Sequence, residues 1–350
     1  MSVSTATPAN DPAALEKRVT TLLAEMTLAE KVGQMSQRNG NDGIAPDYLG
    51  DALRAGRVGS VINAVDTGVI NELQRIAVEE SRLGIPLLIG RDVIHGFKTI
   101  MPIPLGQAAS WNPDVVRDGA SVAAREAAAT GINWTFAPMI DITRDPRWGR
   151  IAESLGEDPF LASKLAVAMV RGFQGDNLAD DGTIAATAKH FAGYGASESG
   201  KDYNTTNIPE NELRNVHLKT FNAAVDAGVA TLMTSFSDLD GIPATASQFL
   251  LQQVLRDEWQ FDGVVVSDWD SIRQLSIHGL TENDRESAFE AVTAGVNMEM
   301  HGDAYRQHLE DLVNEGHVPL ARVDEMVAAI LRTKFRLGLF ESPYVDTSAT

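Results

Sequence analysis

Short apolar runs rich in β-branched residues alternate along this sequence with longer segments whose apolar residues recur at helical spacing. The short runs predict strands, and the longer segments predict amphipathic helices. Strands that alternate with helices in this way pair in parallel, so the sequence predicts an α/β fold. The expected strands are 58–64, 86–90, 134–139, 184–190, 230–235, 263–267 and 296–300, with an eighth around 33–36.

Several helix starts are marked by residues that satisfy the free backbone groups of a first turn. Asp11 followed by Pro12 predicts the start of the first helix. Thr27 with Glu30 forms a capping-box pattern that starts a short helix over 28–34. Further helices are expected over 113–130, 247–259 and 320–337.

The expected strands suit a single (β/α)8 TIM-like barrel over residues 12–340. Residues 1–11 are expected to form a disordered or polar N-terminal tail, and residues 341–350 a linker-like C-terminal tail. An open doubly wound sheet is the alternative, but no glycine-rich phosphate-binding pattern follows an early strand. Long segments follow residues 90, 139 and 190, and long loops at the carboxyl ends of barrel strands are where such folds build sites.

The composition of the chain excludes several classes of partner. Its 350 residues, 44% of them hydrophobic, are enough for a large core. With 48 acidic and 29 basic residues, the formal net charge of −19 leaves no basic surface for phosphates, so we expect neither nucleic acid nor an anionic membrane as a partner. A small neutral molecule such as a sugar suits this charge better. The absence of cysteine excludes disulfides and thiolate chemistry.

The sequence has no recognisable targeting or membrane segment. Residues 1–11 lack the basic start and the apolar run of a secretory signal. No stretch reaches the roughly 20 apolar residues that a membrane span needs. We therefore expect a periplasmic or secreted protein if a signal has been removed, and a cytoplasmic one otherwise.

Ionisable residues stand at the ends of four expected strands. Asp92, Asp141 and Asp268 each follow an apolar run, and Lys189 and His190 end another. Polar groups at the carboxyl ends of parallel strands converge on one face of a barrel. Any one of them could instead cap a helix or form a structural ion pair. Their repetition favours one shared site.

Asp268 has the profile of a catalytic carboxylate. The apolar strand before it fixes its position, and Trp269 directly after it offers a face on which a sugar can stack. In glycoside hydrolysis one carboxylate attacks the anomeric carbon and a second carboxylic acid protonates the leaving oxygen. The combination of Asp268 with Trp269 therefore favours glycoside chemistry. The alternative role for Asp268 is that of a helix N-cap.

Charged donors and acceptors suited to a polyol are present in the same region. Asp92, Arg150, Lys189 and His190 supply both kinds of group. A Schiff base on Lys189 is the competing chemistry, but it would leave the other residues without a role. The seven histidines show no HxH or HExxH pairing, so we expect no metal centre, and we expect no cofactor.

Six motifs carry a resemblance to a known family. They are Asp92-Val-Ile-His-Gly, Ala137-Pro-Met-Ile-Asp, Arg144-Asp-Pro-Arg-Trp-Gly-Arg, Glu153-Ser-Leu-Gly-Glu-Asp-Pro, Lys189-His-Phe-Ala-Gly-Tyr-Gly and Val266-Ser-Asp-Trp. In combination they resemble glycoside hydrolase family three, in its periplasmic-type β-glucosidase branch. The similarity runs from Met26 to Phe340.

The resemblance implies a retaining hydrolase that acts on terminal β-linked glucose, or xylose, in β-glucosides or oligosaccharides. It implies that Asp268 is the nucleophile that forms the glycosyl-enzyme intermediate. The residues that it implies for the sugar subsite are Asp92, Arg150, Lys189, His190, Met233 and Trp269, with Glu153 orienting Arg150.

The chain departs from the family pattern in two respects. Many members have a tyrosine at the position of Phe236, and its hydroxyl would assist the nucleophile. In the β-glucosidases of the family, the acid/base glutamate lies in a second α/β domain after the barrel, where this sequence stops. The N-acetylglucosaminidase branch uses an Asp/His pair on the loop after Lys-His, but the loop here has no histidine, and its carboxylates are Glu198 and Asp202.

We therefore expect the acid/base to come from a second α/β domain or a partner chain. An isolated sugar-binding barrel without efficient turnover is the alternative function.

Overall fold

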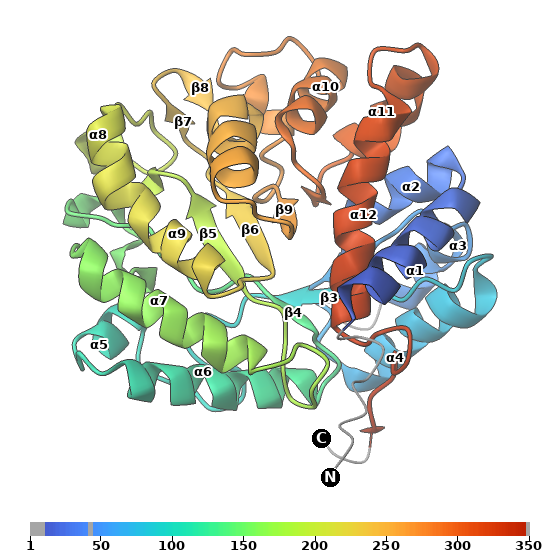
Figure 1. Cartoon of the computed structure of the whole chain (residues 1–350), viewed down its shortest axis with the longest axis horizontal. Coiled ribbons are helices and arrows are strands. Elements are labelled where there is room, and N and C mark those ends of the chain that lie inside the picture. Colours follow the sequence, from blue (N-terminus) through green and yellow to red (C-terminus); the bar gives the residue numbers. More distant parts are fainter. Residues whose placement is uncertain (1–10, 41–44, 348–350) are drawn as a thin grey trace.

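The computed structural model describes residues 11–40 and 45–347. Within these residues, eight parallel strands lie at the centre and helices cover their outer side (Figure 1). The α/β class predicted from the sequence is confirmed. The strands are β1 (Ser36–Asn39), β2 (Ser60–Ile62), β3 (Leu88–Arg91), β4 (Trp134–Thr135), β5 (Thr187–Phe191), β6 (Thr231–Thr234), β9 (Val264–Val266) and β10 (Glu299–Met300).

The central strands pair in two parallel sheets. One sheet has the order β10-β1-β2-β3-β4, and the other has the order β5-β6-β9. Single parallel bridges connect the two sheets. Two lie on one side, between Trp134 and Ala185 and between Met139 and Lys189, and one lies on the other side, between Val266 and Met298. Neighbouring strands are therefore consecutive along the chain, as in a TIM-like fold, and the last strand lies beside the first.

Helices lie between the strands in sequence and pack outside them (Figure 1). The predicted starts are confirmed: the Asp11 carboxylate accepts the backbone N–H of Ala13, and Thr27 and Glu30 form both halves of a capping box. The helices are α1 (Pro12–Glu25), α2 (Leu28–Gln34), α3 (Ala45–Arg54), α4 (Thr67–Arg75), α5 (Pro104–Ala108), α6 (Pro113–Ala128), α7 (Pro159–Gln174), α8 (Glu210–Glu212), α9 (Leu218–Asp226), α10 (Asp284–Ala294), α11 (Ala304–Asn314) and α12 (Leu320–Arg336), with the further helical segments η2 (Ile76–Glu80), η7 (Leu213–His217) and η9 (Phe249–Glu258).

The first strand lies later in the chain than the sequence pattern predicts. The expected eighth strand is present but was placed too early, at 33–36, because Gly33 and Gln34 complete α2, the helix that the capping box starts. The strand β1 begins only at Ser36.

The fourth strand is shorter than the predicted 134–139. Regular pairing ends at Thr135, and further along Met139 makes a single bridge to Lys189. Pro138 lies between them and has no N–H to donate to a neighbouring strand. A short antiparallel hairpin that was not predicted, β7 (Asp238–Leu239) with β8 (Ile242–Pro243), follows β6.

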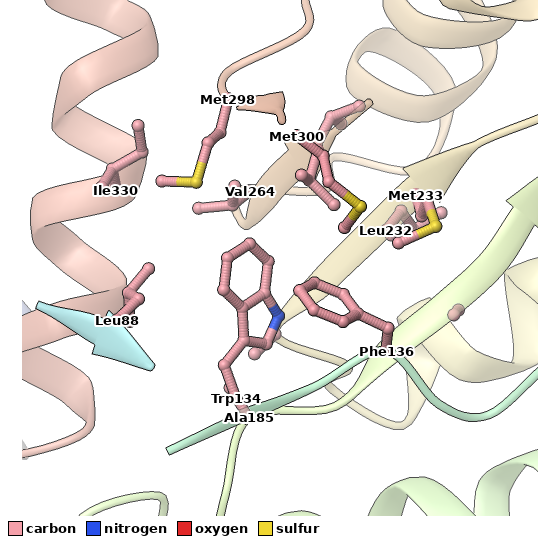
Figure 2. Packing of buried hydrophobic residues seen from close by; sticks show 14 of the residues in the cluster. Leu88, Trp134, Phe136, Ala185, Leu232, Met233, Val264, Met298, Met300 and Ile330 are labelled. Carbon is pink, nitrogen blue, oxygen red and sulfur yellow. The ribbon is translucent and has the colours of Figure 1, made fainter. Parts of the chain in front are cut away.

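Two aromatic rings pack in the space between the central strands (Figure 2). Trp134 and Phe136 are fully buried, with ring centroids 4.8 Å apart. The indole N–H of Trp134 donates to Oγ1 of Thr187 at 2.9 Å and of Thr231 at 3.0 Å, so the polar edge of the ring is satisfied in the interior. Met233 and Met300 lie above this pair in Figure 2, and they also line the cavity described below.

The segment after α12 returns to the surface formed by the outer helices. Glu341 pairs with Arg18 of α1 at 2.6 Å, and the Tyr344 hydroxyl donates to Glu79 at 2.7 Å. The backbone N–H of Val345 donates to the Asn71 side chain at 3.1 Å. The first residues of the expected linker thus contact α1, α4 and η2. Residues 1–10 and 348–350, which complete the two expected tails, lie outside the described residues.

Lys334 of α12 ties this helix to the amino ends of two strands. It is fully buried, and its ammonium group donates to Oε1 of Gln34 at 2.6 Å and to the carbonyl of Gly59 at 2.9 Å. Gln34 and Gly59 lie shortly before β1 and β2. Burial lowers the pKa of Lys334 from 10.5 to about 7.

We expect Lys334→Met to lower the free energy of unfolding by about 2 to 6 kcal/mol at pH 9.5, because two buried acceptors each lose a partner at about 1–3 kcal/mol. The loss should be smaller at pH 7.5. Between pH 10.5 and 7 the unfolded chain binds the proton that folded Lys334 has given up, so its contribution falls as the pH falls. Urea denaturation at both pH values measures the difference. The exposed Lys17→Met is the control, and an equal loss in both variants would contradict the expectation.

Candidate active site

A cavity of about 320 Å³ opens at the carboxyl ends of the strands. Seven of the eight site residues expected from the sequence line it, and the eighth, Glu153, pairs with Arg150. The strands therefore bring together residues that lie far apart in the chain. The lining residues are Ile62, Asn63, Asp92, Arg150, Lys189, His190, Tyr203, Met233, Phe236, Asp268, Trp269 and Met300.

A larger hollow of about 590 Å³ lies at the opposite end of the fold. It is bordered by residues that precede β6 and β9, such as Gly228 and Phe261. Its cation Arg336 is paired with Asp262 at 2.6 Å. The smaller cavity lies at the carboxyl ends of the strands and is lined by the buried Asp268 and His190, whose pKa values are both shifted by burial, so it is the better candidate for chemistry.

Asp268 lies two residues beyond β9 and is 7% exposed. Its Oδ1 accepts the backbone N–H of Trp269 at 2.6 Å, and its own carbonyl accepts the N–H of Ser271 at 3.0 Å. No described residue bonds its buried Oδ2. Burial raises the pKa of Asp268 to about 6. The backbone thus holds one oxygen of the carboxylate and leaves the other available.

Lys189 and Asp92 form an ion pair across the cavity wall. The Lys189 ammonium, on β5, donates to Oδ1 of Asp92 at 2.8 Å. The lysine side chain is 5% exposed, whereas that of Asp92 is 47% exposed. Asp92 therefore presents carboxylate lone pairs to the cavity while Lys189 anchors it from behind.

Arg150 is held by Glu153 through two parallel hydrogen bonds, of 2.7 and 3.0 Å. The guanidinium also stands 5.6 Å from the centroid of the buried Tyr194 ring. Burial acts to lower the pKa of Arg150, but the Glu153 carboxylate outweighs it and the pKa lies above its ordinary value. Glu153 fixes the plane of the guanidinium, as a bidentate pair does.

His190 is 1% exposed and is held by Asp141. Its backbone N–H and its ring Nδ1 lie 2.9 and 2.8 Å from the same oxygen, Oδ2 of Asp141. Its Nε2 lies 3.5 Å from Oδ2 of Asp268. Burial lowers the pKa of His190 well below 6.5, so the ring is neutral near neutral pH, and burial raises the pKa of Asp141 to about 7.

The apolar part of the cavity consists of three aliphatic or methionine side chains and three aromatic ones, which are Ile62, Met233, Met300, Tyr203, Phe236 and Trp269. Met233, 2% exposed, belongs to both the core and the cavity wall. The half-buried Trp269 stacks on His301, with ring centroids 3.9 Å apart and planes 26° apart. The Phe236 ring contacts Tyr203 edge to face at 4.9 Å. An aromatic face beside carboxylates and cations suits a molecule with both polar edges and an apolar face.

Sequence reasoning missed several of these residues. Ile62, Asn63 and Met300 stand at strand ends, but apolar and amide side chains there carry no distinct signal. Tyr203 comes from an irregular loop. Asp141 was recognised as a strand-end carboxylate, but no role was assigned to it, and its partner His190 could have supplied one.

The two carboxylates of the loop after β5 are turned to other partners. Asp202 accepts the indole N–H of Trp148 at 3.0 Å, and Glu198 accepts the side-chain amide of Asn207. Neither lines the cavity. Among the described residues, the carboxylates that line the cavity are Asp92 and Asp268.

Over residues 11–40 and 45–347, no group of three or more histidine, aspartate or glutamate side chains has the arrangement of a metal site. None of the helices described there is both long enough and apolar enough to cross a membrane.

Comparison with known families identifies the class of protein to which this fold belongs. Residues 27–333 match the glycosyl hydrolase family 3 N-terminal domain. The match covers most of the chain, so the chain belongs to this family.

Individual relatives extend this result. The chain is 41% identical to a periplasmic beta-glucosidase of Salmonella typhimurium, over 95% of this chain and 44% of that protein. It is 35% identical to a lysosomal beta glucosidase of Dictyostelium discoideum, over 95% of this chain and 45% of that protein. The crystal structure of a beta-glucosidase from Listeria innocua in complex with glucose superposes with a TM-score of 0.91 at 41% identity, covering 96% of this chain and 48% of that one. The chain thus spans about half the length of these relatives.

Proposed function

We propose that this chain is the catalytic barrel of a retaining β-glucosidase, which cleaves terminal β-linked glucose, or xylose, from small β-glucosides or oligosaccharides. The observation that carries the proposal is the buried Asp268 carboxylate, with one unbonded oxygen, at a cavity lined by paired charges and an aromatic face. The Listeria innocua beta-glucosidase, crystallised with glucose, supports the substrate class. The periplasmic relative supports a location outside the cytoplasm.

In this proposal Asp268 is the nucleophile. Its Oδ2 attacks the anomeric carbon, and the bond from that carbon to the leaving oxygen breaks as an acid delivers a proton to that oxygen. Water then attacks the same carbon, loses a proton to the base, and releases the sugar and the Asp268 carboxylate. Two inversions give overall retention.

The other lining residues would bind the sugar in the subsite before the scissile bond. Asp92 accepts hydroxyl hydrogens, Lys189 and Arg150 donate to hydroxyl oxygens, and Trp269 covers a ring face. The pairing of Lys189 with Asp92 supports a binding role rather than a Schiff base. Met233 packs below the sugar, and Glu153 keeps Arg150 in orientation.

We also propose that the acid/base is a glutamate from a second α/β domain or a partner chain placed over the mouth of a closed eight-stranded barrel. The bridges between the two sheets support the closure. Two carboxylates line the described cavity. Asp268 is the proposed nucleophile and Asp92 is already paired with Lys189, which supports an acid/base that comes from outside the cavity wall.

The same observation favours a second candidate, a sugar-binding barrel without efficient turnover. Proton NMR of an activated aryl β-glucoside during hydrolysis separates the two. The β-anomer of glucose should appear before the α-anomer if the chain is a retaining hydrolase. Calorimetric binding of glucose without any hydrolysis would favour the second candidate instead.

We expect Asp92→Ala to weaken glucose binding about a hundredfold or more, because hydrogen bonds to a charged group contribute about 1.5 to 3 kcal/mol each and two would be lost. Isothermal titration calorimetry measures the change. Asp303→Ala is a matched control, since Asp303 is similarly exposed and pairs with Arg38 at 2.6 Å but does not line the cavity. Unchanged affinity in Asp92→Ala would mean that this carboxylate has only a structural role.

A further inference from the structure

The Asp141 carboxylate lies behind His190 and does not line the cavity. Its side chain is 1% exposed, and its Oδ2 faces both the backbone N–H and the ring Nδ1 of His190. No described residue bonds its Oδ1. The contacts of this buried carboxylate are therefore concentrated on one histidine.

These contacts decide which ring nitrogen of His190 carries the proton. A backbone N–H can only donate, so Oδ2 of Asp141 is an acceptor at that bond. The same oxygen lies 2.8 Å from Nδ1, which makes a proton on Nδ1 the arrangement that satisfies both contacts. A neutral imidazole has one ring proton, so Nε2 then carries a lone pair.

The other side of the ring is consistent with this assignment. Nε2 lies 3.5 Å from Oδ2 of Asp268, beyond the usual N–H···O range, and that oxygen has no described partner. If Nε2 carried the proton, it would donate a hydrogen bond to Oδ2 of Asp268, and the two atoms would lie closer together than 3.5 Å. With a lone pair on Nε2 instead, Oδ2 of the nucleophile stays free of a hydrogen bond from the ring, and the ring offers an acceptor toward the cavity.

We propose that Asp141 is a positioning residue that holds neutral His190 in the Nδ1–H form, so that Nε2 accepts a sugar hydroxyl and does not bond the nucleophile Asp268. The catalytic meaning of this inference rests on the proposed glycosidase function. The tautomer itself is a property of the folded chain and can be measured without turnover.

The charges around the imidazole also bear on its protonation. Arg150 and Lys189 lie close enough to lower the pKa of His190 beyond the effect of burial, and both also counter the rise in the pKa of Asp141 that burial causes. Glu153 acts in the opposite direction on Asp141, and the Tyr194 ring packs edge to face on the imidazole at 5.2 Å. The cations therefore oppose a second ring proton, and Asp141 determines where the single one lies.

The first test is nitrogen NMR of the full chain with 15N-labelled histidine, between pH 6 and 8. The His190 signals are identified by their absence in His190→Gln. We expect a protonated Nδ1 and an unprotonated Nε2. A wild-type spectrum with the proton on Nε2 overturns the proposal, and this measurement requires no variant of Asp141.

The second test is Asp141→Ala, with Glu299→Ala as the matched control. Glu299 is also fully buried and accepts two backbone N–H groups, from Ala304 and Tyr305, so its loss should destabilise the fold comparably. In Asp141→Ala the ring proton should move to Nε2, where Asp268 is the remaining acceptor. An unchanged tautomer in a folded Asp141→Ala variant overturns the proposal.

The pH dependence of kcat/KM separates a positioning role of Asp141 from a merely structural one. In Asp141→Ala, a bond from Nε2–H to Asp268 favours the ionised nucleophile, so the acidic limb of kcat/KM for an aryl β-glucoside should move down by about 0.5 to 1 pH unit. The rate should fall at least about tenfold, as one sugar acceptor is lost. Glu299→Ala should leave the limb in place, and an unmoved limb in Asp141→Ala contradicts the inference. A chain with the expected tautomers but no turnover would instead contradict the proposed function alone.

Discussion

Asp268→Asn is expected to reduce the turnover of an activated aryl β-glucoside by at least about a thousandfold, because an amide is nearly isosteric with the carboxylate but a poor nucleophile. The amide oxygen can still accept the Trp269 N–H that holds Oδ1, so the fold should persist. Steady-state kinetics measure the loss, and circular dichroism checks the fold.

Asp270→Asn provides the matched control for this change. Asp270 lies on the same turn, is partly buried, and pairs loosely with Arg273 at 3.7 Å. Its variant should keep most of the activity. It should also keep an acidic limb of kcat/KM near pH 6, because the nucleophile must be ionised and the pKa of Asp268 is raised to about 6. Comparable losses in both variants would show that the turn, and not Asp268, is what matters.

The rate of hydrolysis by the purified chain should depend strongly on the leaving group of the substrate. Retaining enzymes keep their two carboxyl groups about 5 to 5.5 Å apart, and the described cavity wall offers Asp268 no such free partner. General acid catalysis contributes roughly a hundred to ten thousandfold when the leaving group is poor, and little when it is good. The purified chain should therefore hydrolyse activated aryl β-glucosides slowly and cellobiose hardly at all.

Azide distinguishes a missing acid/base from a generally defective site. A small anion can enter the space that the acid/base would occupy and release the sugar from Asp268 without base assistance. Azide should therefore accelerate turnover of the aryl substrate and yield a glycosyl azide. Efficient hydrolysis of cellobiose by the same preparation would mean that the acid lies within the barrel.

Much of the fold and the site could be predicted because local patterns and tertiary structure agree. The strand and helix patterns alternate, and strand-end residues such as Asp92 and Asp268 converge once the strands are parallel. The caps at Asp11 and Thr27 depend only on neighbouring residues, so the sequence specifies them directly.

The errors in the fold come from competition between neighbouring signals. The segment 33–36 reads Gly-Gln-Met-Ser, and its first two residues complete the helix α2 that the capping box at Thr27 starts, so β1 begins only at Ser36. The run 134–139 begins with the strand-forming residues Trp134, Thr135 and Phe136, but Pro138 has no N–H to donate and interrupts its regular pairing. The hairpin of β7 and β8 has no alternating pattern long enough to be recognised.

The features of the site that could not be predicted depend on contacts between residues that lie far apart in the chain or on irregular loops. The contact of Asp141 with His190 joins residues 49 positions apart, and only the parallel placement of their strands makes it. Tyr203 reaches the cavity from a loop whose path no local pattern determines. The turning of Glu198 and Asp202 toward Asn207 and Trp148 likewise depends on three-dimensional neighbours.

Trapping the covalent intermediate identifies the residue that attacks the sugar, which we propose to be Asp268. A 2-deoxy-2-fluoro-β-glucoside with a dinitrophenyl leaving group slows both steps but allows the first, so the sugar accumulates on the attacking residue. Proteolysis and tandem mass spectrometry then locate the label. We expect a single fluoroglucosyl ester on Asp268, and a label on Asp92, Asp141 or any other carboxylate would show that Asp268 is not the nucleophile.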